Sequence, residues 1–225
     1  MDTLFAYGPM VLSGIGLTIT LSLASLLLAV FFGLLGAWAK LSRHRLPNIL
    51  GNGYTTLVRG IPDLVLMLIV YFGGQTLVNS IGEMTGLWDY IEISPFVAGT
   101  ATIGFIFGAY MTETFRGSYA ALDKGEIEAA LACGMRPLTW LRLIVWPQFV
   151  PLALPSFTNN WLVLLKTTAL VSIIGLQDVM YNANQAGRSS HQPFLFLLLA
   201  FAVYLGLTFL SDLALRQLRN RYKLQ

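Results

Sequence analysis

The sequence predicts an all-α integral membrane protein with five membrane-spanning helices. Of its 225 residues, 56% are hydrophobic and only 11% are charged, whereas soluble domains carry about 25% charged residues. The apolar residues gather in five runs, each near the roughly 20 residues that a helix needs to cross a bilayer. Lys and Arg are distributed unevenly between the segments that join these runs, which is also typical of a membrane protein.

The five runs cover residues 11–39, 64–79, 95–112, 145–165 and 193–211. The first is longer than one crossing requires, so we expect it to tilt or to continue outside the bilayer. Its start, Met1-Asp2-Thr3, lacks the basic segment of a cleavable signal, so this span is expected to remain as an anchor. The glycines that predict close helix packing in the first and third runs are Gly33, Gly36, Gly104 and Gly108.

The distribution of Lys and Arg predicts the orientation of the chain. With the N-terminus outside and the C-terminus in the cytoplasm, all of the 14 basic residues lie on the cytoplasmic side except Lys166 and Arg188. The outer segment 83–92 then holds three acidic residues and no basic one, and residues 175–187 form a polar outer loop. The formal charge of +3 therefore reflects topology, and no nucleic-acid partner is expected.

The sequence offers no motif for catalysis or cofactor binding. Cys133 is the only cysteine, and His44 and His191 lie in loops on opposite sides of the membrane, so we expect no disulfide and no metal site. No Gly-Lys dipeptide occurs, so the chain lacks the Walker A loop that cradles ATP phosphates. The hydrolase motifs His-Glu-x-x-His and Gly-x-Ser-x-Gly are absent as well. We therefore expect a chain that is not an enzyme.

A charged segment between Asp123 and Pro147 separates the third and fourth runs. Asp123 is suited to cap a helix, and Glu126 is placed at the spacing of a capping box. Gly134 is suited to end this helix in a left-handed turn, and Pro137 to begin a second one. Because Pro147 would interrupt the second helix, the segment is predicted to form two short helices joined by a tight turn.

The residue types of this segment resemble the EAA motif of binding-protein-dependent ABC permeases. The matching residues are Glu128, Ala129, Ala130, Gly134, Ile144 and Pro147. The resemblance implies that a loop over about residues 117–147, which also includes Asp123 and Glu126, is the cytoplasmic coupling helix that docks into a cleft of an ATPase subunit. An ordinary amphipathic helix lying on the membrane surface is the alternative.

Three further segments resemble the polar amino acid permeases of that family. They are residues 54–64 (YTTLVRGIPDL), 108–117 (GAYMTETFRG) and 160–170 (NWLVLLKTTAL). The resemblance extends from about residue 10 to the end, and it is strongest to the Q-type permease subunits of histidine, lysine/arginine/ornithine and opine importers. It implies the five-helix fold of type I ABC importer permeases, formed as one domain by residues 1–225.

The same resemblance implies a function and a set of partners. The chain would form half of the translocation pathway of an ATP-driven importer for polar, cationic amino acids in the bacterial inner membrane. Two ATPase subunits would hold the ATP and Mg²⁺, and this chain would hold no cofactor. A soluble substrate-binding protein would deliver the amino acid, and membrane lipid would surround the helices. The second permease subunit would be a homologous partner or another copy of this chain.

Charged side chains near the spans are the first candidates for the pathway, because an ionised group in a bilayer normally faces a cavity or a partner. Asp63, at the start of the second span, either complements the helix dipole and pairs with Arg59, or contacts a cationic substrate. Glu113 lies near the inner end of the third span, with Tyr110 one turn earlier. It either receives a substrate ammonium or guanidinium group, or pairs with Arg59 or Arg116.

The fourth run adds a cation and several polar side chains. Lys166 ends this run on the outer side, where it either extends to the interface or, with Thr167, contacts a substrate carboxylate. Asn159 and Asn160 are placed to join helices by hydrogen bonds. The pathway candidates are therefore Asp63, Tyr110, Glu113, Lys166 and Thr167.

Two other functions remain open. An autonomous ion-coupled carrier or channel would use the segment from Asp123 to Pro147 only as a surface helix, and it would transport without an ATPase. An intramembrane enzyme would need a catalytic constellation, and the sequence shows none.

Overall fold

Helices form the regular structure of residues 2–222, the part of the chain that the computed structural model describes. Five helical stretches are long and apolar enough to cross a membrane, which confirms the predicted number. They are Thr3–Leu41, Asp63–Thr85, Pro95–Ala120, Pro137–Ile174 and Pro193–Arg221. Each begins or ends beyond its apolar run because the flanking residues continue the helix. Met1, at the start of the expected anchor, and Lys223, one of the basic residues expected in the cytoplasm, lie outside the described residues.

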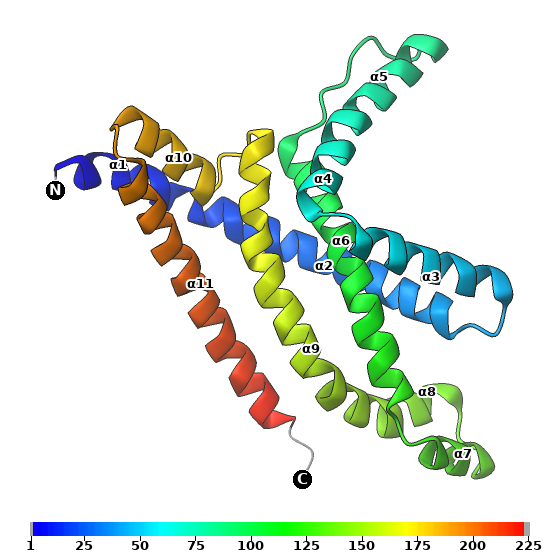
Figure 1. Cartoon of the computed structure of the whole chain (residues 1–225). Helices are drawn as coiled ribbons and strands as arrows, with labels where there is room; N and C mark the ends of the chain where they lie inside the picture. The colour runs from blue at the N-terminus through cyan, green and yellow to red at the C-terminus, as the bar shows by residue number, and fades with distance from the viewer. Residues whose placement is uncertain (1, 223–225) are drawn as a thin grey trace.

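Figure 1 shows the arrangement of these helices. In chain order they are α1 (Asp2–Ser13), α2 (Ile15–Leu41), α3 (Arg45–Gly60), α4 (Asp63–Leu68), the π-helix η1 (Ile69–Gly73), α5 (Gly74–Thr85), α6 (Pro95–Ala120), α7 (Lys124–Ala132), α8 (Pro137–Trp140), the π-helix η2 (Leu141–Val145), α9 (Trp146–Thr167), the 3₁₀-helix η3 (Thr168–Ile174), α10 (Val179–Ser189) and α11 (Pro193–Arg221). Helix α5 projects from the body as an arm, and α7 and α8 form the opposite end.

Helices α2 and α6 make the most extensive contact in the molecule and form its centre. The small residues that α2 buries recur every three or four positions, as Thr18, Ser22, Ser25, Ala29, Gly33 and Gly36. A Cβ atom at Gly36 would overlap Thr112, and none fits at Gly104, which packs on Leu28. Residue numbers rise together along both helices, so the two run parallel. The predicted glycine packing is confirmed, and it brings the backbones close without a large side chain between them.

Helix α3 replaces much of the loop expected between the first two spans. It buries Gly51, Thr55 and Val58, which lie on one face, and it packs against both α2 and α6. The Tyr54 hydroxyl donates a hydrogen bond of 2.6 Å to the carbonyl oxygen of Phe105 on α6. Helix α3 therefore belongs to the packed body of the bundle.

Two extended residues separate α3 from α4. Ile61 has φ −108° and ψ 137°, and Pro62 has φ −57° and ψ 134°. Proline has no N–H to donate and disfavours helical geometry in the residue before it, so α3 ends at this point. Arg59 and Asp63 consequently lie on different helices, and the ion pair considered between them as one interpretation of Asp63 does not occur among the ion pairs of residues 2–222.

A second apolar core joins α1, α10 and α11. The expectation that residues 175–187 form a polar outer loop is wrong, because most of this segment forms helix α10. Asp178 caps this helix, and Val179, Ala183 and Ala186 are buried along one face. A helix with such a narrow apolar face looks polar in sequence, although it packs against two neighbours.

Candidate functional site

The segment from Asp123 to Pro147 folds as a helical hairpin, hereafter the hairpin. Asp123 Oδ1 accepts a hydrogen bond of 2.8 Å from the Gly125 N–H, which confirms the predicted cap of α7. Gly134 has φ +70°, a left-handed conformation that favours glycine, and the Met135 N–H donates to the Ala130 carbonyl at 3.1 Å. These contacts form the tight turn after which Pro137 begins α8, as predicted.

Two expectations for the hairpin are wrong. Glu126 does not complete a capping box, because its carboxylate accepts a hydrogen bond of 2.5 Å from Gln148 on α9. Pro147 does not end the second helix, which continues from α8 through η2 and α9 as part of the stretch Pro137–Ile174. Pro147 lies in the first turn of α9, directly after the π-helix η2, and Pro151 and Pro155 lie further along the same helix. The hairpin therefore continues directly into a membrane span.

The hairpin exposes apolar side chains at the end of the bundle. Leu138 is 77% exposed, and Leu131 and Leu141 are also exposed. Of the EAA-like residues, Ala130 is buried and Ile144 is half-buried, whereas Glu128, Ala129, Gly134 and Pro147 are exposed. A cleft of about 460 Å³ beside α7 is lined by Glu128 together with Arg43 and Lys124. An exposed surface that mixes apolar and charged side chains is suited to contact another protein.

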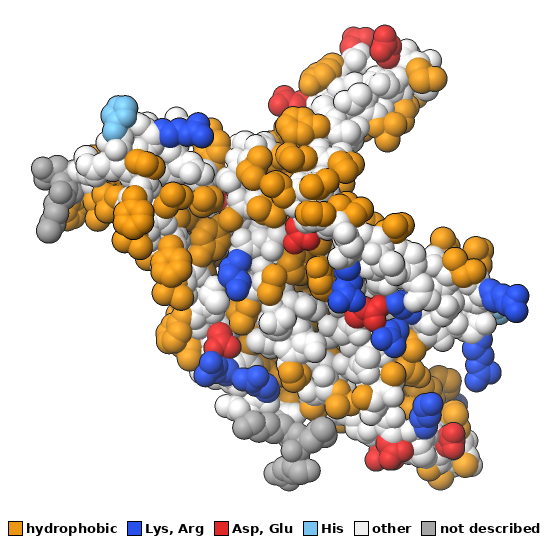
Figure 2. Space-filling model, viewed as in Figure 1, with side chains coloured by type: hydrophobic (Ala, Val, Ile, Leu, Met, Phe, Trp, Pro, Cys, Tyr) orange, Lys and Arg blue, Asp and Glu red, His pale blue; other side chains and the backbone are white. Residues whose placement is uncertain are grey.

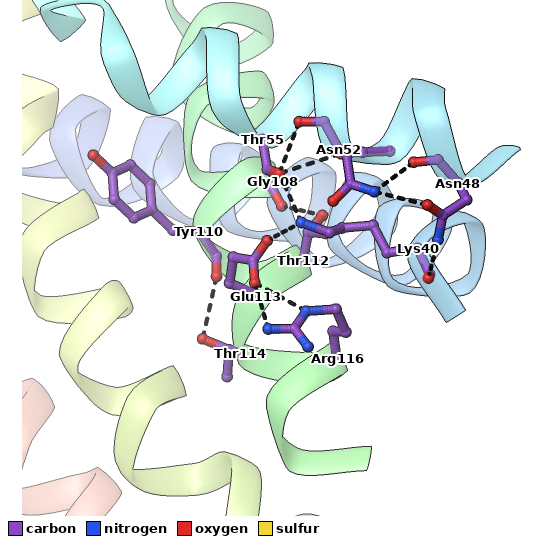
Figure 3. A network of polar contacts seen from close by, with 11 residues as sticks. Lys40, Asn48, Asn52, Thr55, Gly108, Tyr110, Thr112, Glu113, Thr114 and Arg116 are labelled. Atoms are coloured by element: carbon purple, nitrogen blue, oxygen red, sulfur yellow. Dashed lines mark hydrogen bonds and ion pairs between the residues drawn. The ribbon is translucent and has the colours of Figure 1, made fainter. Parts of the chain in front are cut away.

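A polar network joins α2, α3 and α6 toward the C-terminal ends of α2 and α6 (Figure 3). The Lys40 ammonium group donates to Glu113 and, at 3.0 Å, to Thr55 Oγ1. Arg116 donates to the other Glu113 oxygen, at 3.0 Å from Nε and 2.9 Å from a terminal nitrogen. Lys40 and Glu113 are largely buried, with side-chain exposures of 11% and 22%. Glu113 is therefore neutralised by two cations of its own chain.

Two open clefts meet at this network. One of about 530 Å³ lies between α3, α6 and α9, and one of about 460 Å³ lies between α2, α3 and α6. Arg59, Tyr110 and Glu113 line both. The Arg59 guanidinium group lies over the Tyr110 ring, 5.2 Å from its centroid. Asn160 on α9 donates a hydrogen bond of 3.0 Å to Thr114 Oγ1 on α6, which confirms that its side chain joins two helices.

The structure brings together only two of the five predicted pathway residues. Tyr110 and Glu113 share the two clefts, whereas Asp63, Lys166 and Thr167 line neither. Asp63 is half-buried at the start of α4. Lys166 does not end the fourth span, because the helix continues through η3 to Ile174. The Thr167 hydroxyl donates a hydrogen bond of 3.0 Å to the Val163 carbonyl of its own helix.

Two site residues were missing from the pathway candidates: Lys40 was counted only as a cytoplasmic cation, and Arg59 was considered only as an ion-pair partner of Asp63 or Glu113. Lys40 ends a long apolar run, and Arg59 is followed by Gly60 and precedes a proline. A cation directly beside an apolar run or a helix break was the available signal, because such a group needs a partner or a cavity. The pattern could not reveal that α3 folds back against α6.

Charged clefts that open between the helices of a membrane protein are typical of transport proteins. Figure 2 shows that apolar side chains cover much of the visible surface, while Lys and Arg gather mainly over its lower half. A sequence profile of the family described as binding-protein-dependent transport system inner membrane component matches residues 29–224. The chain belongs to this family, whose members are non-catalytic permease subunits of ABC importers located in the inner membrane.

Individual relatives agree with this assignment. The histidine/lysine/arginine/ornithine transport system permease protein HisQ of Salmonella typhimurium is 46% identical over 219 residues, covering 97% of this chain and 96% of that protein. The octopine transport system permease protein OccQ of Rhizobium radiobacter is 39% identical over 215 residues, covering 96% and 91%. A crystal structure of an amino acid ABC transporter with histidines matches with a TM-score of 0.81 and 28% identity, covering 97% of this chain and 96% of that chain. The chain is thus a permease subunit of an amino acid ABC importer.

Proposed function

We propose that the chain imports cationic amino acids as one of two permease subunits above a pair of ATPases. Support for the substrate class comes from relatives whose names specify histidine, lysine, arginine, ornithine and octopine. The second permease subunit is proposed to be a homologous chain, as the sequence resemblance to Q-type subunits implies. A substrate-binding protein delivers the amino acid at the arm end of the bundle, and the hairpin end faces the cytoplasm.

The hairpin is the contact with the ATPase, and its geometry carries the proposal. Its exposed leucines supply an apolar centre for a docked partner, and the charged edge comes from its Lys124 and Glu128 together with Arg43 of the adjacent α2–α3 connection. Because α8 is continuous with α9, a displacement of the hairpin moves a membrane span. ATP binding and hydrolysis in the partner would thus alternate the access of the central clefts without any covalent chemistry in this chain.

The pathway itself runs along the polar residues of the bundle. Tyr110 and Glu113 form its wall at the level of the two clefts, and Asp63, Lys166 and Thr167 are proposed to line it at other levels. Support for this placement is energetic, because charged groups within a bilayer are stable only beside a cavity or a partner.

The coupling role is tested by replacing Gly134 with valine in the complete importer, reconstituted with its ATPases and binding protein. Both Gly134 and Gly117 have open space where a Cβ would lie, but only Gly134 has a positive φ. Gly134→Val therefore strains the turn by about 1–2 kcal/mol, whereas Gly117→Ala does not and serves as the control. We expect loss of uptake and of substrate-stimulated ATP hydrolysis in the valine variant alone. Normal coupling in Gly134→Val would refute the docking role of the hairpin.

The orientation is tested with the single cysteine of the chain. Cys133 is exposed in the hairpin turn. A membrane-impermeant maleimide should label it in inside-out vesicles without ATPase and leave it unlabelled in right-side-out vesicles. The opposite labelling would reverse the proposed topology.

A further inference from the structure

Arg59 differs from the other cations of the central site because no carboxylate among the described side chains forms an ion pair with it. The ion pairs of residues 2–222 are Lys40 with Glu113, Arg116 with Glu113, and Arg216 with Asp212. Arg59 takes part in none of these, and its neighbour Tyr110 offers only the face of a neutral ring. Its guanidinium group therefore keeps its hydrogen-bond donors available to the clefts that it lines.

The net positive charge of the residues around Arg59 favours an anionic ligand group over a cationic one. Lys40, Arg59 and Arg116 contribute three positive charges, and Glu113 contributes the single negative one. Because Glu113 already accepts from two cations, an incoming ammonium group would have to displace one of them from a partly buried pair, which is costly. A carboxylate would instead meet an arginine whose planar fork matches its two oxygens.

The remaining lining suits the polar end of an amino acid. Ser156, Asn159 and Asn160 lie on one face of α9, at the spacing of a single helical turn, and line the cleft of about 530 Å³ with Arg59. This volume falls within the range of small-molecule sites. Hydroxyl and amide groups there can accept hydrogen bonds from an α-ammonium group without adding charge.

We propose that Arg59 binds the α-carboxylate of the transported amino acid, and that Glu113 positions Lys40 and Arg116 without receiving the cationic side chain. This inference rests on the proposed amino acid import. It assigns recognition of the group that every amino acid shares to the membrane subunit, and it leaves discrimination between side chains to other residues and other subunits.

The test measures ligand binding to the purified permease–ATPase complex without the binding protein, so that the selectivity of the binding protein does not contribute. The probes are L-arginine and agmatine, which is arginine without its carboxylate. We expect the wild-type complex to prefer arginine. Arg59→Gln should weaken arginine binding by roughly tenfold to a hundredfold, as for loss of a charge-assisted bidentate pair, and leave agmatine unchanged. Arg45→Gln, an exposed arginine at the other end of α3, is the control.

Several results would overturn the inference. Equal binding of arginine to wild type and Arg59→Gln would do so, as would equal losses for arginine and agmatine. Dissociation of the two permease subunits in Arg59→Gln, detected by size-exclusion chromatography, would show that Arg59 holds an acidic group of the partner instead. If Arg59→Gln does not fold, Arg59→Lys keeps the charge without the fork and should give a smaller, arginine-selective loss.

The role of Glu113 is tested with citrulline, the neutral isostere of arginine. Glu113→Gln should change arginine and citrulline binding by the same factor if Glu113 only positions its neighbours. A loss confined to arginine would show that Glu113 receives the cationic side chain. Absence of ATP-driven uptake in the wild-type importer would refute the proposed function itself, whereas normal uptake with unchanged binding in Arg59→Gln would refute the role of Arg59 alone.

Discussion

Asp178 is a fully buried carboxyl group in the contact between α1, α2, α10 and α11. Its Oδ1 accepts a hydrogen bond of 2.8 Å from the Tyr181 N–H at the start of α10, and its Oδ2 accepts one of 3.2 Å from the Tyr204 hydroxyl. Burial raises the pKa of Asp178 from 3.8 to about 6, and the hydrogen bonds only partly oppose this. The carboxylate is consequently charged at neutral pH at a cost to stability.

The magnitude is set by the difference between the folded and unfolded pKa values. At about 1.4 kcal/mol for each pH unit, ionisation of Asp178 costs roughly 3 kcal/mol of folding free energy. The folded state binds the proton more tightly, so the stabilisation that the protonated carboxyl group gives is fully present below the unfolded pKa of 3.8 and is lost as the pH rises through about 6, above which the full cost applies. Asp178→Asn keeps an acceptor for the Tyr181 N–H but cannot ionise. We therefore expect it to be more stable than wild type at pH 7.5, by up to roughly 3 kcal/mol.

The assay is thermal unfolding of the purified chain in detergent, followed by tryptophan fluorescence at pH 4.5, 6 and 7.5. The difference between Asp178→Asn and wild type isolates this carboxyl group from all others that titrate. It should be small at the lowest pH and reach several degrees at the highest. Asp89→Asn, which removes an exposed carboxylate from the segment between α5 and α6, should show no such trend. A variant that is less stable than wild type at pH 7.5, or a difference that does not change with pH, would refute the reasoning.

Two other substitutions test the packing of the bundle. Gly36→Leu should lower the yield and thermal stability of the folded protein, because even a Cβ would overlap Thr112 and overpacking costs about 1–3 kcal/mol; a yield and midpoint equal to wild type would contradict the close α2–α6 contact. Tyr54→Phe removes the hydrogen bond to Phe105 and should lower stability by about 1 kcal/mol, measured as a reduced unfolding midpoint, while an unchanged midpoint would indicate that water replaces the hydroxyl.

The sequence predicted the features that depend on local chemistry. Long apolar runs require spans in any fold, and Asp123, Gly134 and Pro137 act on their own backbone, so the number of spans and the hairpin turn were predicted correctly. Helices α3 and α10 were missed because each has a short amphipathic pattern that becomes helical against neighbours distant in sequence.

The central site was predicted only in part for the same reason. Glu113 and Arg116 lie one turn apart on α6, so their ion pair is expected from the sequence. The partner Lys40 is 73 residues away from Glu113, and their pairing depends on the parallel packing of α2 and α6. The helix continues past Pro147 directly after a π-helix, for which the residues 141–145 carry no distinctive signal.

The unbroken helical stretch from Pro137 to Ile174 has a mechanical consequence. Its 38 residues connect α8 in the hairpin to η3 at the far end, and the chain changes direction where η2 meets the first turns of α9 (Figure 1). A π-turn followed by Pro147, Pro151 and Pro155 places the usual causes of helix bending in this region. A movement of α8 would therefore reach the membrane span through this bend. Because Asn160 on α9 donates a hydrogen bond to Thr114 on α6, the same movement would act first on the clefts beside Tyr110.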